Sequence, residues 1–328
     1  MLFAGDRKVW KSFSSYTQNI NILSAELSKI VINGYVFPED CGSIDTNKKI
    51  LFKKLFSEYY ERRIIGFNSF KSGKTWMLLG NEADKIERKY IGYGFSNEYG
   101  LFDTTGTAAG LCTDNLKIKA MCELIEKNES MLFWYTTCSK KIIIDEYIRN
   151  ILKKMNMDKM EIYIYYNNEL GNLHTIIILC FENGVFLSSG SCCSLSYNHA
   201  IEQAILEAKL IKTVYYDRGV FPIEHLKDTS FLLKIFNFIN DKNSKLKYLD
   251  YIPSEQDTPI LKEWIGPLNY AGLEIIPHSR SKSIRCFSKK LINCVPYKEN
   301  LKKMLDKKIV KKYNIEKMLD VVPLYPLF

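Results

Sequence analysis

The stretch TDNLKIKAMCELIEKNESMLFWY, residues 113–135, decides the fold, because its apolar residues surround a helix almost completely. Such a pattern predicts a helix that is buried in the protein. Glu123 and Glu126 nevertheless lie within it, three residues apart and therefore on neighbouring turns of one face. A buried, unpaired carboxylate is too costly to remain charged, so it needs a cation, a metal ion or a shifted pKa. Lys127 can neutralise one of the two, and the second needs a further partner.

Two other predicted helices carry acids among apolar residues in the same way. Glu58 and Glu61 are again three residues apart and are followed by Arg62 in SEYYERR, and Glu207 lies in AIEQAILEAKLI. A cluster of carboxylates without His or Cys favours hard cations such as Mg²⁺, which commonly accompany nucleotide phosphates. The pattern therefore predicts a carboxylate metal site and nothing finer.

The alternative is that these acids lie on solvated helix surfaces. Glu-x-x-Glu is common on such surfaces, and Glu58 with Arg62 can form an ordinary pair one turn apart. For the lysine-rich helix over residues 47–63, taken alone, we prefer this alternative, but for residues 113–135 we do not.

Apolar periodicity and turn residues outline the rest of the chain as helices and strands. Small residues over 102–110 predict a tight loop, and Thr113 or Asp114 can cap the helix that follows. The fold class is α+β, with helices packed against sheets. Helices are predicted over residues 47–63, 142–155 and 196–216, and strands over 74–80, 88–95, 160–166, 174–182 and 272–277.

Composition excludes several classes of protein. The 328 residues are 46% hydrophobic and 25% charged, which is ordinary for a globular chain. No apolar run reaches the roughly 20 residues that span a bilayer, and the first residues lack the apolar region of a signal peptide. The nine cysteines include no Cys-x-x-Cys pair, and their odd number does not suit a complete disulfide framework. We therefore expect a cytoplasmic protein without a membrane partner.

The net charge of +9 is concentrated in the last thirty residues, in KENLKKMLDKKIVKKYNIEK. This stretch is either a basic surface for an acidic peptide or, as we prefer, a solvated helix face with interspersed acids. Motifs for nucleic-acid binding are absent, so no nucleic-acid partner is expected. SGKT (72–75) resembles the end of a Walker loop, but Asn68 replaces its first glycine and a strand is predicted to follow it.

In the order and spacing of its acids, the chain resembles the YcaO-domain family. The first Glu-x-x-Glu-Arg pattern is Glu58-Tyr-Tyr-Glu61-Arg62, and the Gly-x-Ala-Ala-Gly loop is residues 106–110. The second pattern is Glu123-Leu-Ile-Glu126-Lys127, and a third helix adds Glu207. SEYYERR and SLSYNHA look closest to the cyclodehydratase subunit of microcin-type azole-peptide synthetases. The match covers residues 40–216, roughly half of the chain.

The resemblance implies a YcaO-type fold, with helices packed on mixed or antiparallel sheets around a central nucleotide site. It implies one domain over residues 1–310, with the ATP-site motifs in 47–216, and a tail over 311–328 with a proline-rich end. The implied cofactors are ATP and Mg²⁺. If the roles of the family's residues apply to the matching positions, the Mg²⁺ ligands are Glu58, Glu61, Glu123, Glu126 and Glu207. The nucleotide contacts are then Glu61, Arg62, Lys127 and Asn115, and the carboxylate of Phe328 is a member of the active site.

Three departures from the family pattern bear on these roles. Lys127 stands for the usual Arg and lacks its bidentate fork, and Lys54 replaces a small or hydroxyl residue. The terminal Pro323-x-x-Pro326 differs from the alternating prolines of azoline-forming members, and a frayed terminus is the alternative for it.

The implied reaction is ATP-dependent cyclodehydration of a ribosomal precursor peptide. A Cys, Ser or Thr side chain attacks the preceding amide carbonyl, ATP phosphorylates the resulting oxyanion, and loss of phosphate leaves a thiazoline or oxazoline. Thioamide or amidine formation is an alternative within the family, and a non-catalytic peptide-binding scaffold is an alternative outside enzymes. The chain is short for a fused leader-binding domain, so we expect a separate E1-like leader-binding partner, with a flavin-dependent dehydrogenase as a further partner.

Overall fold

A computed structural model of the chain describes residues 20–26, 31–32, 35–36, 40–70, 73–79, 82–88, 92–110, 113–214, 228–273 and 282–326. The chain forms two compact units, each made of two segments. Unit 1 comprises Met1–Leu124 and Trp264–Val295, and unit 2 comprises Ile125–Glu263 and Pro296–Phe328. The boundary between them falls inside one helix, so the expectation of a single domain over residues 1–310 followed by a tail stays a prediction.

Unit 1 is built on an antiparallel sheet with the strand order β6-β5-β14-β15-β9. The long helix α1 (Lys48–Phe70) packs on one face of this sheet, where Ile64 and Ile65 join Met77, Ala271 and Phe287 in a buried core. The strands of the sheet are β5 (Lys74–Leu79), β6 (Glu82–Glu87), β9 (Thr107–Gly110), β14 (Asn269–Leu273) and β15 (Lys282–Phe287).

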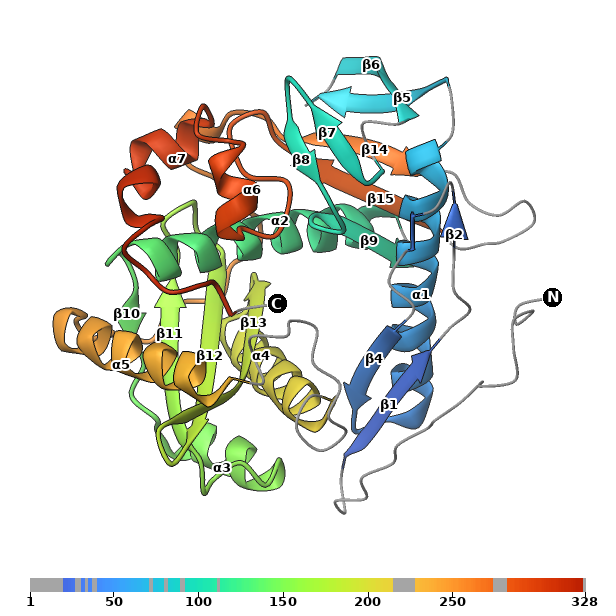
Figure 1. The fold of residues 1–328 in the computed structure, drawn as a ribbon. Helices are drawn as coiled ribbons and strands as arrows, with labels where there is room; N and C mark the ends of the chain where they lie inside the picture. The colour runs from blue at the N-terminus through green and yellow to red at the C-terminus, as the bar shows by residue number, and fades with distance from the viewer. Residues whose placement is uncertain are drawn as a thin grey trace. The chain divides into compact units, whose positions relative to one another are not determined.

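Three short strand pairs complete the described part of unit 1. β1 pairs with β4 beside α1, where Leu23 and Cys41 contact Leu51 and Leu55 (Figure 1). The pairs are β1 (Asn21–Glu26) with β4 (Asp40–Asp45), β2 (Val31–Ile32) with β3 (Tyr35–Val36), and β7 (Gly94–Ser96) with β8 (Gly100–Phe102).

Unit 2 contains a second antiparallel sheet, in the order β10-β11-β12-β13. One face is covered by α4, which approaches so closely that a Cβ on Gly190 would lie 2.1 Å from the carbonyl of Ala204. On the other face Tyr165 packs against Phe133 and donates a hydrogen bond to Asn243. The strands are β10 (Lys140–Lys141), β11 (Glu161–Asn167), β12 (His174–Glu182) and β13 (Val185–Ser194).

Some helices of unit 2 lie beside this sheet, and others come after it in the sequence (Figure 1). They are α3 (Glu146–Lys154), α4 (Tyr197–Lys212), α5 (Thr229–Lys245), α6 (Lys298–Lys302), α7 (Lys308–Lys312) and the 3-10 turn η5 (Ile315–Met318). Another 3-10 turn, η4 (Glu263–Ile265), crosses the boundary, because Glu263 belongs to unit 2 and Trp264 to unit 1. The acid-bearing helix α2 (Thr113–Tyr135) begins in unit 1 and ends in unit 2.

Most predicted elements are confirmed, and α2 and β12 have the predicted bounds. The predicted strand over 88–95 is partly wrong, since Arg88 is in a turn after β6 and Gly92 and Tyr93 precede the strand that begins at Gly94, while 89–91 lie outside the described residues. The predicted loop over 102–110 is also partly wrong, because Thr107–Gly110 forms β9. In the described part of the chain, no helix combines the length and the apolar character that crossing a bilayer requires.

Candidate active site

Glu58 is held on α1 by two donors from unit 1. The backbone N–H of Gly42 donates to its Oε2 over 3.1 Å, and Nη2 of Arg62 donates to its Oε1 over 2.5 Å. Gly42 lies in β4, which pairs with β1 on its other side, so this N–H comes from the open edge of a strand. The Glu58 and Arg62 side chains are 30% and 29% exposed, so solvent screens the pair only in part.

Glu61 lies one turn further along α1 and contacts β9. Its Oε1 is 2.5 Å from Oγ1 of Thr107, a hydroxyl that is also 2.5 Å from the carbonyl oxygen of Thr104. Burial raises the pKa of Glu61 to about 7, and the charge of Glu58 adds to this, although Lys119, Thr107 and Arg62 oppose it. A neighbouring cation would therefore stabilise the ionised form of Glu61.

Glu123 shares its surroundings with Arg285, a residue that is fully buried in β15. Nη1 of Arg285 donates to the carbonyl of Gly92 over 2.9 Å, and its guanidinium lies 5.1 Å from the ring centre of Phe102. Burial lowers the pKa of Arg285 to about 10, and the negative charges of Asp103, Glu123 and Glu61 counteract this. A buried guanidinium beside predicted ligands is a permanent positive charge in unit 1.

Glu126 and Glu207 are both held by the edge strand β13 in unit 2. Ser191 donates its side-chain hydroxyl to Glu126 over 2.7 Å and its backbone N–H to Glu207 over 2.5 Å. The backbone N–H of Cys193 donates to the second oxygen of Glu126 over 3.2 Å. These N–H groups are available because β13 is the last strand of the sheet, so no other strand of that sheet bonds to its outer edge. One strand edge thus positions carboxylates from α2 and α4.

Lys127 pairs with its neighbour Glu126, at 3.1 Å from Nζ to Oε1. Both side chains are mostly buried, with exposures of 12% and 13%. The described part of the C-terminal tail packs beside them. Nε1 of Trp134 donates to the carbonyl of Pro323 over 3.0 Å, and burial raises the pKa of the Tyr325 hydroxyl, with Lys127 opposing the shift and Glu126 adding to it. The tail is therefore packed, and not frayed, up to Pro326.

The roles of two further residues stay predictions. Asn115 is exposed in the first turn of α2, and Phe328 lies outside the described residues. The structure adds Thr107, Ser191 and Arg285, which sequence reasoning missed. An arginine inside the apolar run SIRCF (283–287) was a usable signal for Arg285. No pattern indicated the two hydroxyl residues, because their role depends on which strand edge faces a helix.

The donor set fits Mg²⁺ carried by a nucleotide. The predicted ligands are all carboxylates, with Arg62 and Lys127 as neighbouring cations, and hard oxygen donors are those that Mg²⁺ prefers. Within the described residues, no group of three or more His, Cys, Asp or Glu side chains is assembled to hold a metal ion. Mg²⁺ with a nucleotide commonly takes one or two carboxylates, and phosphate and water supply the rest, so a protein cage is not required.

Solved structures share this fold at low sequence identity. YcaO from Methanopyrus kandleri, bound with AMPPCP and Mg²⁺, is 12% identical, with a TM-score of 0.65 and coverage of 87% of this chain and 86% of that one. The E. coli microcin synthetase McbBCD complex is 14% identical, with a TM-score of 0.61 over 88% and 90%. The same complex with pro-MccB17 bound is 12% identical, with a TM-score of 0.58 over 85% and 87%. The comparison with curated proteins gave no match.

The likeness to these structures confirms the expected fold, an α+β arrangement of helices on antiparallel sheets. A family model extends the comparison to the sequence. Residues 21–259 match the model described as YcaO cyclodehydratase, ATP- and Mg²⁺-binding. Because this match spans well over half of the chain, the protein belongs to the YcaO family, whose cofactors are ATP and Mg²⁺.

Proposed function

We propose that this protein is an ATP- and Mg²⁺-dependent cyclodehydratase that forms thiazolines or oxazolines from Cys, Ser or Thr residues of a ribosomal precursor peptide. The observation that carries the proposal is the way its carboxylates are held. Glu58, Glu126 and Glu207 each accept a hydrogen bond from a backbone N–H of a strand edge, in a chain of the YcaO family. Selection for stability alone does not require three half-buried acids with such preformed support.

In this proposal the glutamates are Mg²⁺ ligands and the cations face phosphate. The proposed ligands are Glu58, Glu61, Glu123, Glu126 and Glu207. Arg62 and Lys127 neutralise phosphate charge, with Asn115 as a further nucleotide contact and the Phe328 carboxylate acting on the peptide. Bound ATP supplies the phosphoryl group that turns a peptide oxygen into a leaving group.

The chain's own residues contribute positioning and charge to this chemistry. Phosphoryl transfer depends more on neutralised charge and alignment than on a protein nucleophile. Ser191 and Gly42 fix carboxylate oxygens before a ligand arrives, which reduces the ordering cost of binding. We also propose a cytoplasmic enzyme that works with a separate leader-binding protein and a flavin-dependent dehydrogenase, as the multi-subunit microcin synthetase suggests by its fold likeness.

Calorimetric titration with a non-hydrolysable ATP analogue tests the nucleotide site. We expect binding that requires Mg²⁺ and that weakens roughly 100-fold in the Glu123→Gln, Glu126→Gln double variant, the upper range for losing metal support. Glu202→Gln is the matched control, because Glu202 is exposed on the same helix as Glu207 and accepts a hydrogen bond from the Tyr147 hydroxyl. Equal affinity of wild type and double variant would refute the assignment.

Mass spectrometry of a co-expressed precursor peptide tests the reaction. Cyclodehydration removes one water per ring, whereas thioamide formation exchanges oxygen for sulfur. We expect loss of water that depends on Glu126 and releases one ADP and one phosphate per ring. A mass change that exchanges oxygen for sulfur would mean that the enzyme forms thioamides, with the ATP site assignment unaffected. An unmodified peptide together with intact nucleotide binding would favour a non-catalytic scaffold.

A further inference from the structure

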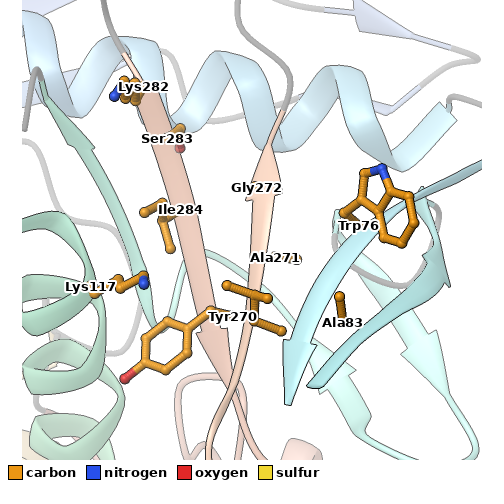
Figure 2. Close-up of a pocket in the computed structure, with 10 residues that line it drawn as sticks. Trp76, Ala83, Lys117, Tyr270, Ala271, Gly272, Lys282, Ser283 and Ile284 are labelled. Carbon is orange, nitrogen blue, oxygen red and sulfur yellow. The ribbon is translucent and has the colours of Figure 1, made fainter. Parts of the chain in front are cut away.

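An open apolar groove lies on the outer face of the five-stranded sheet of unit 1. Figure 2 shows its floor, formed by β14 and β15, with Trp76 and Ala83 on one side and Lys117 on the other. Its volume is about 610 Å³, which is within the range of binding sites. Trp76 is 62% exposed and Leu78 is 38% exposed, and both side chains belong to the groove.

Strand alternation explains why this face is apolar. Met77 and Ala271 point to the core beneath α1, so Trp76, Leu78 and Tyr270 point to the opposite face. The first turns of α2 cover the β9 end of that face, where Leu116 lies 3.1 Å from an ideal Cβ on Gly110. The described residues leave the β14 part open, because a Cβ on Gly272 would meet none of their atoms within 4 Å.

The charged side chains that line the groove are lysines. Lys117 and Lys282 are the charged residues among those that line it, and Nζ of Lys85 lies 5.0 Å from the ring centre of Trp76. Of the acids of β6, Glu82 and Asp84 lie opposite Leu79 and Met77, so their side chains are on the other face of the sheet, whereas Glu87 lies opposite Lys74 at the far end of β6, on the Trp76 face. A ligand in this groove therefore meets apolar surface below and lysine ammonium groups at the rim.

We propose that this groove binds a segment of a partner polypeptide that combines aliphatic or aromatic residues with acidic ones. Tryptophan is a typical anchor of a protein interface, whereas a solvated sheet face normally carries polar residues. Charge complementarity with the lysines at the rim selects an acidic segment. The inference is independent of the ATP site, so its failure and that of the proposed function are separate results.

Fluorescence anisotropy with two labelled synthetic peptides tests the proposal on the full chain. One peptide intersperses leucine and tryptophan with glutamate, and the other has lysine in place of glutamate. We expect the glutamate peptide to bind with an affinity that falls with added salt, and the lysine peptide to bind at least about tenfold more weakly.

Trp76→Glu is the variant that tests the site, since it removes the anchor and adds a repelling charge. We expect it to weaken binding of the glutamate peptide at least about tenfold. Ile252→Glu is the matched control, because Ile252 is 80% exposed and lies in unit 2, and it should leave the affinity unchanged. Circular dichroism and thermal melting will check that both variants fold.

Three results overturn the inference. Equal affinity for the two peptides, or binding that survives Trp76→Glu, would show that the groove does not select an acidic segment. Self-association in sedimentation velocity that Trp76→Glu abolishes, together with no peptide binding, would assign the groove to a second copy of this chain. If the Glu123→Gln, Glu126→Gln variant binds the glutamate peptide like the wild type, the groove acts separately from the nucleotide.

Discussion

The two units hold their predicted ligands in different ways. In unit 1, Glu58 and Glu61 have separate supports, the Gly42 N–H for one and the Thr107 hydroxyl for the other. In unit 2, the single residue Ser191 supports both Glu126 and Glu207, through its hydroxyl and its N–H. A change in unit 1 should therefore affect one carboxylate, whereas a change near Ser191 should affect two ligands on different helices.

The largest effect is expected from Gly190→Ala, beside Ser191. A Cβ at this position would lie 2.1 Å from the Ala204 carbonyl and 2.5 Å from the Ala208 nitrogen, so α4 must move and carry Glu207 with it. We expect a loss of about 3 kcal/mol or more in the free energy of unfolding, at the upper end for overpacking. Urea unfolding measures it.

Gly272→Ala is the matched control for this prediction. It also places a methyl group within a strand, but there the methyl group meets no atom of the described part of the chain within 4 Å. The change should cost nothing or stabilise the protein by about 0.5 kcal/mol, because alanine restricts the unfolded chain. Similar destabilisation by the two substitutions would show that α4 does not press on β13.

Ser191→Ala isolates the shared support without the steric change. The variant loses the hydroxyl that donates to Glu126 but keeps the N–H that donates to Glu207. A hydrogen bond to a charged group contributes about 1.5–3 kcal/mol, so we expect the Mg²⁺-dependent affinity for an ATP analogue to fall roughly 10-fold to 100-fold. Calorimetry at several Mg²⁺ concentrations measures this.

Ser191→Thr is the control, since it keeps a hydroxyl at the same position. Recovery of affinity in this variant would show that the hydroxyl acts, and not the volume of the side chain. Unchanged affinity in Ser191→Ala would mean that the N–H groups of Ser191 and Cys193 suffice, and the two units would then support their ligands alike.

A buried acid that the site does not use gives unit 2 a pH dependence. Glu129 is 1% exposed on α2, and burial raises its pKa to about 8, although the N–H of Leu170 and the charge of Lys262 oppose this and Glu169 adds to it. Between the ordinary value of 4.5 and about 8, the folded protein binds more protons than the unfolded one. Stability should therefore fall as the pH rises through this window, by at most about 1.4 kcal/mol per pH unit.

Glu129→Gln should remove this slope, because the amide keeps an oxygen for the Leu170 N–H and cannot ionise. Urea unfolding of both proteins from pH 5 to pH 8 provides the comparison. Parallel curves would show that Glu129 is ionised in the folded protein at neutral pH. The wild type and Glu129→Gln should agree best at the acidic end.

Sequence patterns located the acid-bearing helices but not the strand edges that hold the acids. Residues 113–135 predicted α2 because a helix that is apolar all round needs no knowledge of its neighbours. β13 gives no such signal, since SSGSCCS is made of small residues whose place depends on α4 packing against Gly190. β9 was predicted as a loop for the same reason, and it became a strand by pairing with β15, which is distant in the sequence.

The smallest effect is expected from Thr107→Val, the counterpart of Ser191→Ala in unit 1. The Thr107 hydroxyl has one proton and lies at 2.5 Å from both Glu61 and the Thr104 carbonyl, so its support of Glu61 is shared. The loss should therefore be that of an ordinary hydrogen bond, about 0.5–1.5 kcal/mol, with nucleotide affinity lowered only a few-fold. The same calorimetric series measures it, and Thr107→Ser restores the hydroxyl as a control. If Thr107→Val lowered the affinity for the nucleotide more than Ser191→Ala does, the most important support of a carboxylate would lie in unit 1. Whether a support is shared or separate would then not determine the size of the effect.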